Sequence, residues 1–382
     1  PQCPALPDEP YTIWEKIDGC LLGNTKLNLW GGGTIRIRDV VKKRLDVTLV
    51  GMNEQGQIVP ARVVDWHDNG AKDNWMLVTV DCNVSRDRAA GGYLNNIPIT
   101  SNHQVWVNGK LQPVHTIRRG DVLTTFEYAP AASVLKMIEA GLLGDGCLTA
   151  AHHVIRYQEN HVARHRSYTE EIVRWLGECA IKGRETKSGY GSTMTWANSR
   201  AYRSLSSLRD KWYPEGKKQI PQNLSWVDDF VIAKWYMDDG SLIHHPSQQD
   251  RATFATNAFS AEGVARLAAK MGEMYGVDCR VYQSKGWNIR INAGRDGAIN
   301  AFWEAIAPHI VDCMRYKLPQ RYRATPYRAY PAGKEEALPL PTKVLDVQLL
   351  TGGTVGSNSN HFYFHAGKKG YDIQTTTGNY FV

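Results

Sequence analysis

The stretch Gly19-Cys20-Leu21-Leu22-Gly23-Asn24-Thr25 decides how the rest of this 382-residue sequence is interpreted. Taken alone, it is a cysteine after a glycine, followed by a short apolar run. Two distant segments give it meaning: Ile99-Thr100-Ser101-Asn102-His103 and Gly370-Tyr371-Asp372-Ile373-Gln374. Together they contain a cysteine, a threonine, a histidine and an aspartate.

Residues 20–128, which follow from this stretch, have the pattern of a β domain. Short runs that alternate apolar and polar residues are separated by turn signals rich in glycine and asparagine. Asn108-Gly109, between Val105-Trp106-Val107 and Lys110-Leu111, predicts a two-residue hairpin. Many short strands without helices indicate a compact all-β fold.

From Pro130 the pattern changes to helices that alternate with strands. A helix is expected after Ser133, whose side chain could cap it, and this helix ends at Gly144-Asp145-Gly146. About ninety residues later, the apolar run 230–237 leads into Asp238-Asp239-Gly240. Strand-like runs and a second capped helix follow each of these segments. This internal repeat predicts two pseudo-symmetric halves.

The proline-, alanine- and glutamate-rich residues 331–343 have the composition of a linker. Residues 343–349 and 371–374 then return to strand-like patterns. The helical segment is therefore interpreted as an insertion into the β domain.

Composition limits the class of protein. A hydrophobic content of 42 % and a charged content of 22 % are ordinary for a globular protein, and no apolar run is long enough to span a bilayer. The seven cysteines form no C-x-x-C pair, which argues against a zinc site or a disulfide scaffold. Residues 130–330 carry 27 Lys and Arg against 20 Asp and Glu, so the whole net charge of +7 lies there. A basic, aromatic-rich segment fits a phosphate-backbone partner.

The three segments of the first paragraph resemble the splicing blocks of inteins, which excise themselves from a host protein. The resemblance implies an all-β, horseshoe-like Hint splicing domain that needs no cofactor. In it Cys20 attacks the Gly19 carbonyl, His103 protonates the amide nitrogen, Thr100 orients the bond and Asp372 assists the thiol. Asn379 stands where the family often has a histidine. The chain stops before the His-Asn pair that ends an intein, so we expect a thioester at Cys20 but not completed splicing.

The segment 130–330 resembles the LAGLIDADG homing endonucleases. That resemblance implies an α+β domain with two αββαββα halves, whose two motif helices deliver Asp145 and Asp239 to the scissile phosphates. The two carboxylates would bind Mg²⁺ to cleave double-stranded DNA at a long target site. Lys285 is the candidate for an assisting lysine and Lys187 is its weaker counterpart. The expected DNA contacts are Arg156, Gln158, Lys187, Arg251, Gln283, Arg290 and Asn292. Lys217-Lys218 and Lys317 are assigned to backbone contact or packing.

Residues 16–19, Lys16-Ile17-Asp18-Gly19, resemble the K-x-D-G motif of ATP-dependent DNA and RNA ligases. In that family the lysine is adenylated, as a nucleophilic amine that attacks a phosphate. Inteins tend to lie inside host active-site motifs, so Lys16 would belong to the host and be idle here.

The expected organisation is therefore a host fragment (1–19), a split splicing domain (20–129 and 344–382), an endonuclease (130–330) and a linker (331–343). The expected partners are double-stranded DNA and a host protein in cis. A monomer in the cytoplasm is expected, with no membrane association. Two alternatives stay open: an intein whose inserted domain binds DNA without cutting it, and a fragment of a nucleic-acid ligase.

Overall fold

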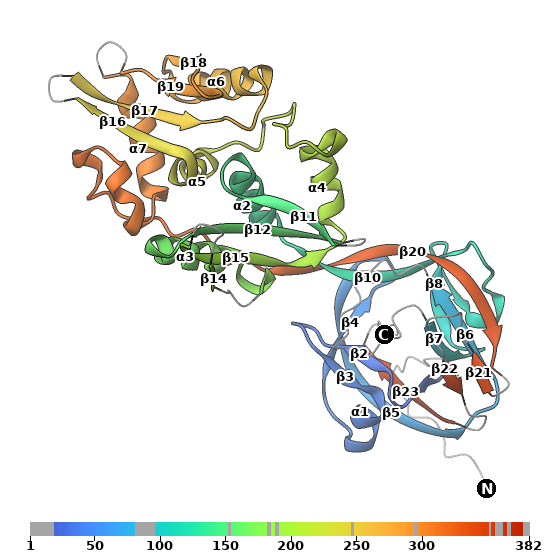
Figure 1. Ribbon diagram of the computed structural model, residues 1–382. Helices are drawn as coiled ribbons and strands as arrows, with labels where there is room; N and C mark the ends of the chain where they lie inside the picture. The colour runs from blue at the N-terminus through green and yellow to red at the C-terminus, as the bar shows by residue number, and fades with distance from the viewer. Residues whose placement is uncertain are drawn as a thin grey trace, which may run out of the picture. The chain divides into compact units, whose positions relative to one another are not determined.

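The computed structural model describes residues 19–80, 96–151, 154–181, 185–187, 191–245, 248–293, 297–350, 353–355, 362–364 and 368–376. The chain divides into two compact units (Figure 1). The first unit contains the described residues up to 127 and those from 337 onward, and the second contains 128–336.

A ten-stranded sheet organises the first unit. Its strands, in spatial order, are β4 (Thr48–Met52), β5 (Ile58–Ala71), β23 (Lys369–Thr375), β1 (Leu21–Leu22), β7 (Asn96–Thr100), β6 (Trp75–Val80), β20 (Glu335–Leu349), β10 (Val122–Pro130), β8 (Gln104–Val107) and β9 (Lys110–Pro113). Smaller elements are the pair β2 (Lys26–Asn28) and β3 (Thr34–Arg36), the pair β21 (Gly353–Val355) and β22 (Phe362–Phe364), and the helix α1 (Ile37–Lys43).

The three segments that decide the sequence interpretation lie on neighbouring strands. β1 runs between β23 and β7, antiparallel to both, and Leu21 faces Tyr371 on one side and Ile99 on the other. Leu21 is fully buried, and Cys20 packs with Leu22, Trp75, Leu77 and Leu350 in a small apolar cluster. Strand pairing thus brings together segments that are far apart in sequence.

The predicted hairpin at Asn108-Gly109 is confirmed. β8 and β9 pair from Val107 opposite Lys110 to Gln104 opposite Pro113. Both turn residues have positive φ, 51° for Asn108 and 76° for Gly109. Asparagine and glycine adopt this conformation at low cost, which is why the dipeptide specifies the turn.

The segment expected as a linker, residues 331–343, differs in the structure because β20 begins at Glu335. The strand lies beside β10 in the sheet and pairs with β6, with Val344 opposite Val80. These partners satisfy backbone groups that the proline-rich composition alone would leave to water. Just before β20, the Ala131 N–H donates to the Lys334 carbonyl over 3.0 Å, so the chain enters and leaves the second unit side by side.

The second unit contains two halves of similar element order, with one additional short strand, β14, in the first half. Its first half is α2 (Ala132–Leu143), β11 (Cys147–Ala151), β12 (Val154–Val162), α3 (Arg166–Leu176), β13 (Ala180–Ile181), β14 (Glu185–Lys187), β15 (Thr193–Tyr202) and α4 (Leu205–Trp212). Its second half is α5 (Asp229–Asp239), β16 (Gly240–His245), β17 (Gln248–Ala255), α6 (Ala261–Tyr275), β18 (Cys279–Gln283), β19 (Trp287–Ile291) and α7 (Ile299–Ile306). The two sheets have the orders β11-β12-β15-β13 and β16-β17-β19-β18.

α2 and α5 pack against each other in the core of this unit. The contact is close, because a Cβ on Gly144 would overlap the Asp238 carboxylate. Asp228 caps α5 by accepting from the Val231 N–H. Of the two following helices expected to be capped, α6 is capped by Ser260, which accepts from the Gly263 N–H, whereas α3 has no side-chain cap. The expected cap at Ser133 is wrong, because α2 begins at Ala132 after Ala131 and has no side-chain cap. None of the helices among the described residues is long and apolar enough to cross a membrane.

Candidate functional sites

The first site surrounds the amide between Gly19 and Cys20. Cys20 is only 2 % exposed and lies immediately before β1. Its N–H donates to Thr100 Oγ1 over 2.7 Å, and the Thr100 N–H donates to the Cys20 carbonyl over 3.1 Å. Thr100 therefore fixes the amide nitrogen whose bond to Gly19 would break in an acyl shift.

His103 packs against Gly19, the residue that supplies the carbonyl of this amide. A Cβ on Gly19 would overlap both His103 Cα and Nδ1, so only glycine fits at that position. Burial lowers the pKa of His103 to about 4, although a backbone hydrogen bond with Gly19 opposes the fall. The ring is therefore neutral at pH 7. Once protonated, it would be a strong acid beside a nitrogen that needs a proton.

Asn69 and Gly370 complete the surroundings of the thiol. Asn69, on β5, donates from Nδ2 to Cys20 Sγ over 3.2 Å. A Cβ on Gly370 would lie 3.0 Å from the same sulfur. Asp372 is buried on β23, and extending the register of β1 by one residue places Cys20 opposite Asp372. The structure thus gathers Cys20, just before β1, Thr100 at the end of β7, His103 in the turn that follows β7, and the backbone of Asp372 on β23. Lys16 and Asn379 lie outside the described residues.

The second site lies where α2 and α5 end. Asp145 follows the C-terminus of α2 and is exposed, whereas Asp239 is the last residue of α5. Burial, and then the negative charge of Asp145, raises the pKa of Asp239 to about 6. The two carboxylates are therefore close enough to repel each other. That repulsion is relieved when a cation binds.

Lysines cap the C-terminal carbonyls of both helices. Lys218 Nζ donates to Gly144 O over 3.1 Å and to Gly146 O over 2.7 Å. Lys317 Nζ donates to Met237 O over 2.6 Å and to Asp238 O over 3.2 Å. Burial lowers the pKa of both ammonium groups, against the opposing effect of nearby acidic groups. Positive charge is therefore held at both helix ends, beside the two acidic positions.

Asp239 borders an open cavity of about 150 Å³. Gly144 and Lys218 also line it, with residues 255–259 of the second half. A carboxylate, an ammonium group and main-chain carbonyls thus meet at a space that solvent can enter.

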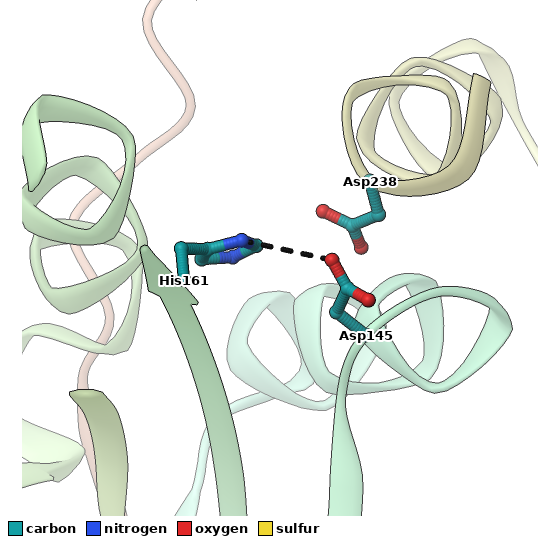
Figure 2. A group of neighbouring side chains, drawn as sticks. All are labelled: Asp145, His161 and Asp238. Carbon is teal, nitrogen blue, oxygen red and sulfur yellow. Dashed lines mark ion pairs between the residues drawn. The ribbon is translucent and has the colours of Figure 1, made fainter. Parts of the chain in front are cut away.

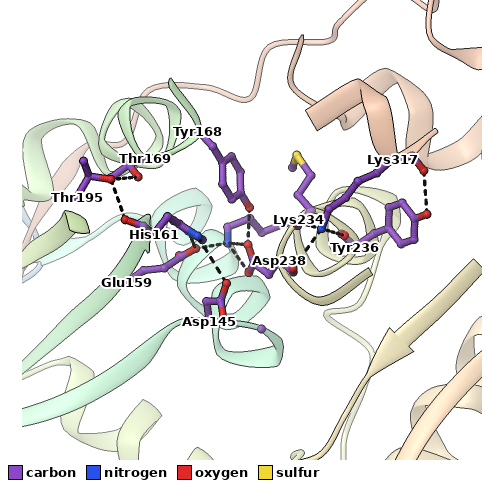
Figure 3. A network of polar contacts seen from close by, with 12 residues as sticks. Asp145, Glu159, His161, Tyr168, Thr169, Thr195, Lys234, Tyr236, Asp238 and Lys317 are labelled. Carbon is purple, nitrogen blue, oxygen red and sulfur yellow. Dashed lines mark hydrogen bonds and ion pairs between the residues drawn. The ribbon is translucent and has the colours of Figure 1, made fainter. Parts of the chain in front are cut away.

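A buried ionic network lies beneath the helix ends (Figure 3). Lys234 Nζ lies 2.9 Å from Glu159 Oε1 and 2.6 Å from Asp238 Oδ2, and all three side chains are fully buried. Tyr168 donates its hydroxyl to Asp238 over 2.5 Å, and the Tyr157 hydroxyl donates to Glu159. The network joins a strand of the first half to the motif helix of the second.

One ammonium serves two carboxylates in this network. Burial, and then Glu159, raises the pKa of Asp238 to about 7 even though Lys234 opposes the rise. Burial alone would raise the pKa of Glu159, but Lys234 and His161 hold it below its usual range. Of the two buried carboxylates, Glu159 therefore resists protonation more strongly than Asp238.

His161 connects the network to Asp145 (Figure 2). Its Nε2 lies 2.7 Å from Glu159 Oε1, and its Nδ1 lies 3.6 Å from Asp145 Oδ2. Burial would lower the pKa of His161, but the hydrogen bond with Glu159 gives a net rise. Ligand atoms of Asp145, His161 and Asp238 lie within 4.8 Å of one another, a donor set that could hold a metal ion.

The two lysines proposed for catalysis lie elsewhere on this unit. Lys285 is exposed in the tight loop between β18 and β19, with a φ of 52°. Lys187 is exposed at the end of β14. The lysines that the structure brings to the helix ends are instead Lys218 and Lys317, which the sequence interpretation assigned to backbone contact or packing.

The expected DNA-contacting residues follow the alternation of their strands. On β12, Tyr157, Glu159 and His161 are buried while Arg156 and Gln158 are partly exposed. β17 and β19 alternate likewise, and leave Arg251 and Arg290 on the partly exposed side. The remaining members are Gln283, exposed at the end of β18, and Asn292, which donates to Asp278.

Asn69, Glu159, His161 and Lys234 are the site residues that sequence reasoning missed. A lysine within the apolar run 230–237 was the available signal, because a buried ammonium requires an acidic partner. Nothing local marks Glu159 as that partner, 75 positions away. The contact of Asn69 with Cys20 depends on strand pairing alone.

The comparisons with known proteins agree with the division of the chain into two units. Residues 136–297 match the LAGLIDADG DNA endonuclease family, so the chain carries a LAGLIDADG endonuclease domain. The chain is 27 % identical over 383 residues to Protein RecA of Mycolicibacterium fallax, covering 94 % of this chain and 88 % of that protein. It is 26 % identical over 387 residues to Protein RecA of Mycobacterium gastri, covering 94 % and 90 %. These relationships fit intein-containing RecA proteins, and they give no support to a ligase host.

Two solved structures are similar to parts of the chain. One is the homing endonuclease I-WcaI bound to its DNA recognition sequence, with 21 % identity, coverage of 50 % of this chain and 88 % of that one, and a TM-score of 0.44. The other is a DnaB intein from Synechocystis sp. PCC 6803, with 17 % identity, coverage of 28 % and 69 %, and a TM-score of 0.24.

Proposed function

We propose that the second unit is a site-specific DNA endonuclease that cuts both strands of a long target. The observation that carries this proposal is the pair of carboxylates, Asp145 and Asp239, at the ends of two packed helices. Their mutual repulsion and the hard oxygen donors fit Mg²⁺. When bound, such an ion supplies an activated water and stabilises the leaving oxygen.

The residues of the chain divide the remaining work. Asp145 and Asp239 would hold the cations, one at each helix end. Lys218 and Lys317 place positive charge beside them, where the scissile phosphates must approach. Arg251 and Arg290, on the partly exposed side of the second sheet, are suited to phosphate or base contacts. Lys285 and Lys187 remain candidates for DNA contact from their exposed positions.

Cleavage can be tested without knowing the target in advance. The wild-type chain first selects binding sequences from a randomised duplex library in Ca²⁺, and the selected duplex is then incubated with Mg²⁺. Asp145→Asn and Asp239→Asn are expected to abolish cutting and retain binding. Asp312→Asn, at a side chain that is 85 % exposed, is the matched control. Cutting by both Asn variants would refute the assignment of the metal ligands.

We propose that the first unit is an intein splicing domain whose first step occurs at Cys20. The thiol sulfur attacks the Gly19 carbonyl carbon, the new C–S bond forms and the C–N bond to Cys20 breaks. The thiol proton ends on the released amine of Cys20, by way of His103. Thr100, hydrogen-bonded to that nitrogen, supports this direction of transfer. Asp372 is proposed to assist the thiol.

The thioester has a simple chemical test. Added dithiothreitol would exchange with it and release residues 1–19, which intact mass spectrometry detects. We expect release from the wild-type chain and none from Cys20→Ala. An unchanged wild-type mass after hours would refute the proposed step.

An inactive, DNA-binding insertion is the second candidate, and the intact pair Asp145 and Asp239 favours an active one. A ligase fragment would require transfer of AMP to Lys16. We expect none, and incubation with labelled ATP checks it.

A further inference from the structure

The strand registers align the two halves of the second unit residue by residue. In the first half Cys147 faces Gln158, which places Gly146 opposite Glu159. In the second half Gly240 faces Phe254. Gly146 follows Asp145 and Gly240 follows Asp239, so Glu159 corresponds to Phe254. His161, two residues further on, then corresponds to Thr256.

The motif helices differ in the same way. Counting back from Asp145 and Asp239, Gly144 corresponds to Asp238 and Ala140 to Lys234. Every charged member of the buried network therefore has an uncharged counterpart in the other half. Its asymmetry is built into the packing, since a side chain at Gly144 would collide with the Asp238 carboxylate.

The asymmetry reaches the two acidic positions through His161. The ring is fixed by Glu159 at 2.7 Å and by packing on Tyr168, with ring centroids 4.9 Å apart. It is 7 % exposed and directs Nδ1 to within 3.6 Å of Asp145 Oδ2 (Figure 2). Asp239 instead lines the cavity together with Lys218, and Thr256 occupies the strand position that corresponds to His161.

We propose that His161 is a positioning residue for Asp145 alone, so that the two DNA strands are cut by chemically different centres. This inference rests on the proposed endonuclease function. An imidazole held by Glu159 fixes the orientation of the Asp145 carboxylate, and with it the cation that Asp145 would bind. Loss of the imidazole therefore converts an enzyme that cuts both strands into one that nicks a single strand.

The experiment follows each strand separately. The selected duplex carries a different fluorophore on each 5′ end, and the two cleavage rates are measured on denaturing gels in Mg²⁺. His161→Asn is expected to slow one strand by about 10- to 100-fold, the usual effect of removing a partner of a metal ligand. The other strand should keep its rate, so nicked duplex accumulates. His309→Gln is the matched control, a histidine of the same unit that packs on Phe230.

Binding of the selected duplex in Ca²⁺ shows that each variant is folded. Glu159→Gln keeps the shape of the side chain and weakens its hold on His161, so it should bias the same strand to a smaller degree. If the His161→Asn variant does not bind the selected duplex, the strand bias of the Glu159→Gln variant tests the proposed role of His161. Equal slowing of both strands in the folded variants would overturn the proposed role of His161. Absence of cutting by the wild-type chain would instead overturn the endonuclease function, and the inference with it.

Discussion

Replacing Lys234 by methionine should destabilise the second unit strongly. The ammonium group is fully buried and lies within 2.9 Å of both Glu159 and Asp238, whose side chains are also fully buried. Methionine fills similar volume, so the main effect is to leave two carboxylates without their counter-charge. Breaking a buried ion pair from one side costs about 3–5 kcal/mol. We expect a loss of that size in the free energy of unfolding.

The loss should depend on pH in a definite direction. Without the ammonium, the pKa of Glu159 rises above its value in the unfolded chain, and the pKa of Asp238, which burial already raises to about 7, rises further. Protonation then relieves the repulsion. The penalty should therefore be largest above pH 7 and shrink as the pH falls.

Urea unfolding followed by tryptophan fluorescence measures this effect. Trp175, Trp212, Trp235 and Trp303 are fully buried in the second unit and report on its unfolding. The control is Lys136→Met, which breaks a half-exposed pair with Asp228 and should cost less than about 1 kcal/mol.

A triple variant that combines Lys234→Met, Glu159→Gln and Asp238→Asn removes all three charges together. It should recover much of the lost stability, because no buried charge is then left without a partner. A Lys234→Met penalty no larger than that of the Lys136→Met control would refute the reasoning.

Three further predictions concern the interiors of the two units. The pKa of His103 falls to about 4 on folding, so the unfolded chain takes up a proton on this side chain first as the pH drops. The free energy of unfolding should therefore be largest above about pH 6.5 and fall by about 3 kcal/mol toward pH 4. Urea titrations should show that His103→Phe removes this pH dependence. Asn69→Ala removes the donor to Cys20 Sγ and should slow dithiothreitol-induced release of residues 1–19 about tenfold by intact mass, whereas an unchanged rate would show the contact to be incidental. Gly141→Ala, ordinarily favourable inside a helix, should cost about 1–3 kcal/mol in urea unfolding, because its Cβ would overlap the Tyr157 hydroxyl.

Features that depend on a few neighbouring residues, such as turns and helix ends, could be predicted from the sequence. Asn108-Gly109 specified its hairpin because few other residues accept positive φ at both positions. The motif Gly144-Asp145-Gly146 marked the end of a helix, since glycine there is required by the approach of Asp238. The start of α2 was less predictable. Ser133 has a side chain that could cap a helix, but the helix begins one residue earlier, at Ala132 after Ala131, without a side-chain cap.

Contacts between distant segments could not be predicted from one sequence. Lys234 signalled that an acidic partner exists, but β12 supplies it from 75 positions away. Likewise, nothing near Asn69 indicates a cysteine 49 positions earlier. The extent of β20 was missed for the same reason, because its partner strands, and not its composition, satisfy its backbone.

The hydrogen bond between Ala131 and Lys334 has a consequence for how this gene could change. Because the chain leaves the β unit and returns to it at adjacent points, deletion of residues 132–333 would open almost no gap. A short turn could join β10 to β20 and leave the sheet order intact. A single deletion in the gene could therefore remove the second unit, and a single insertion could have introduced it, without changing the strands of the first unit.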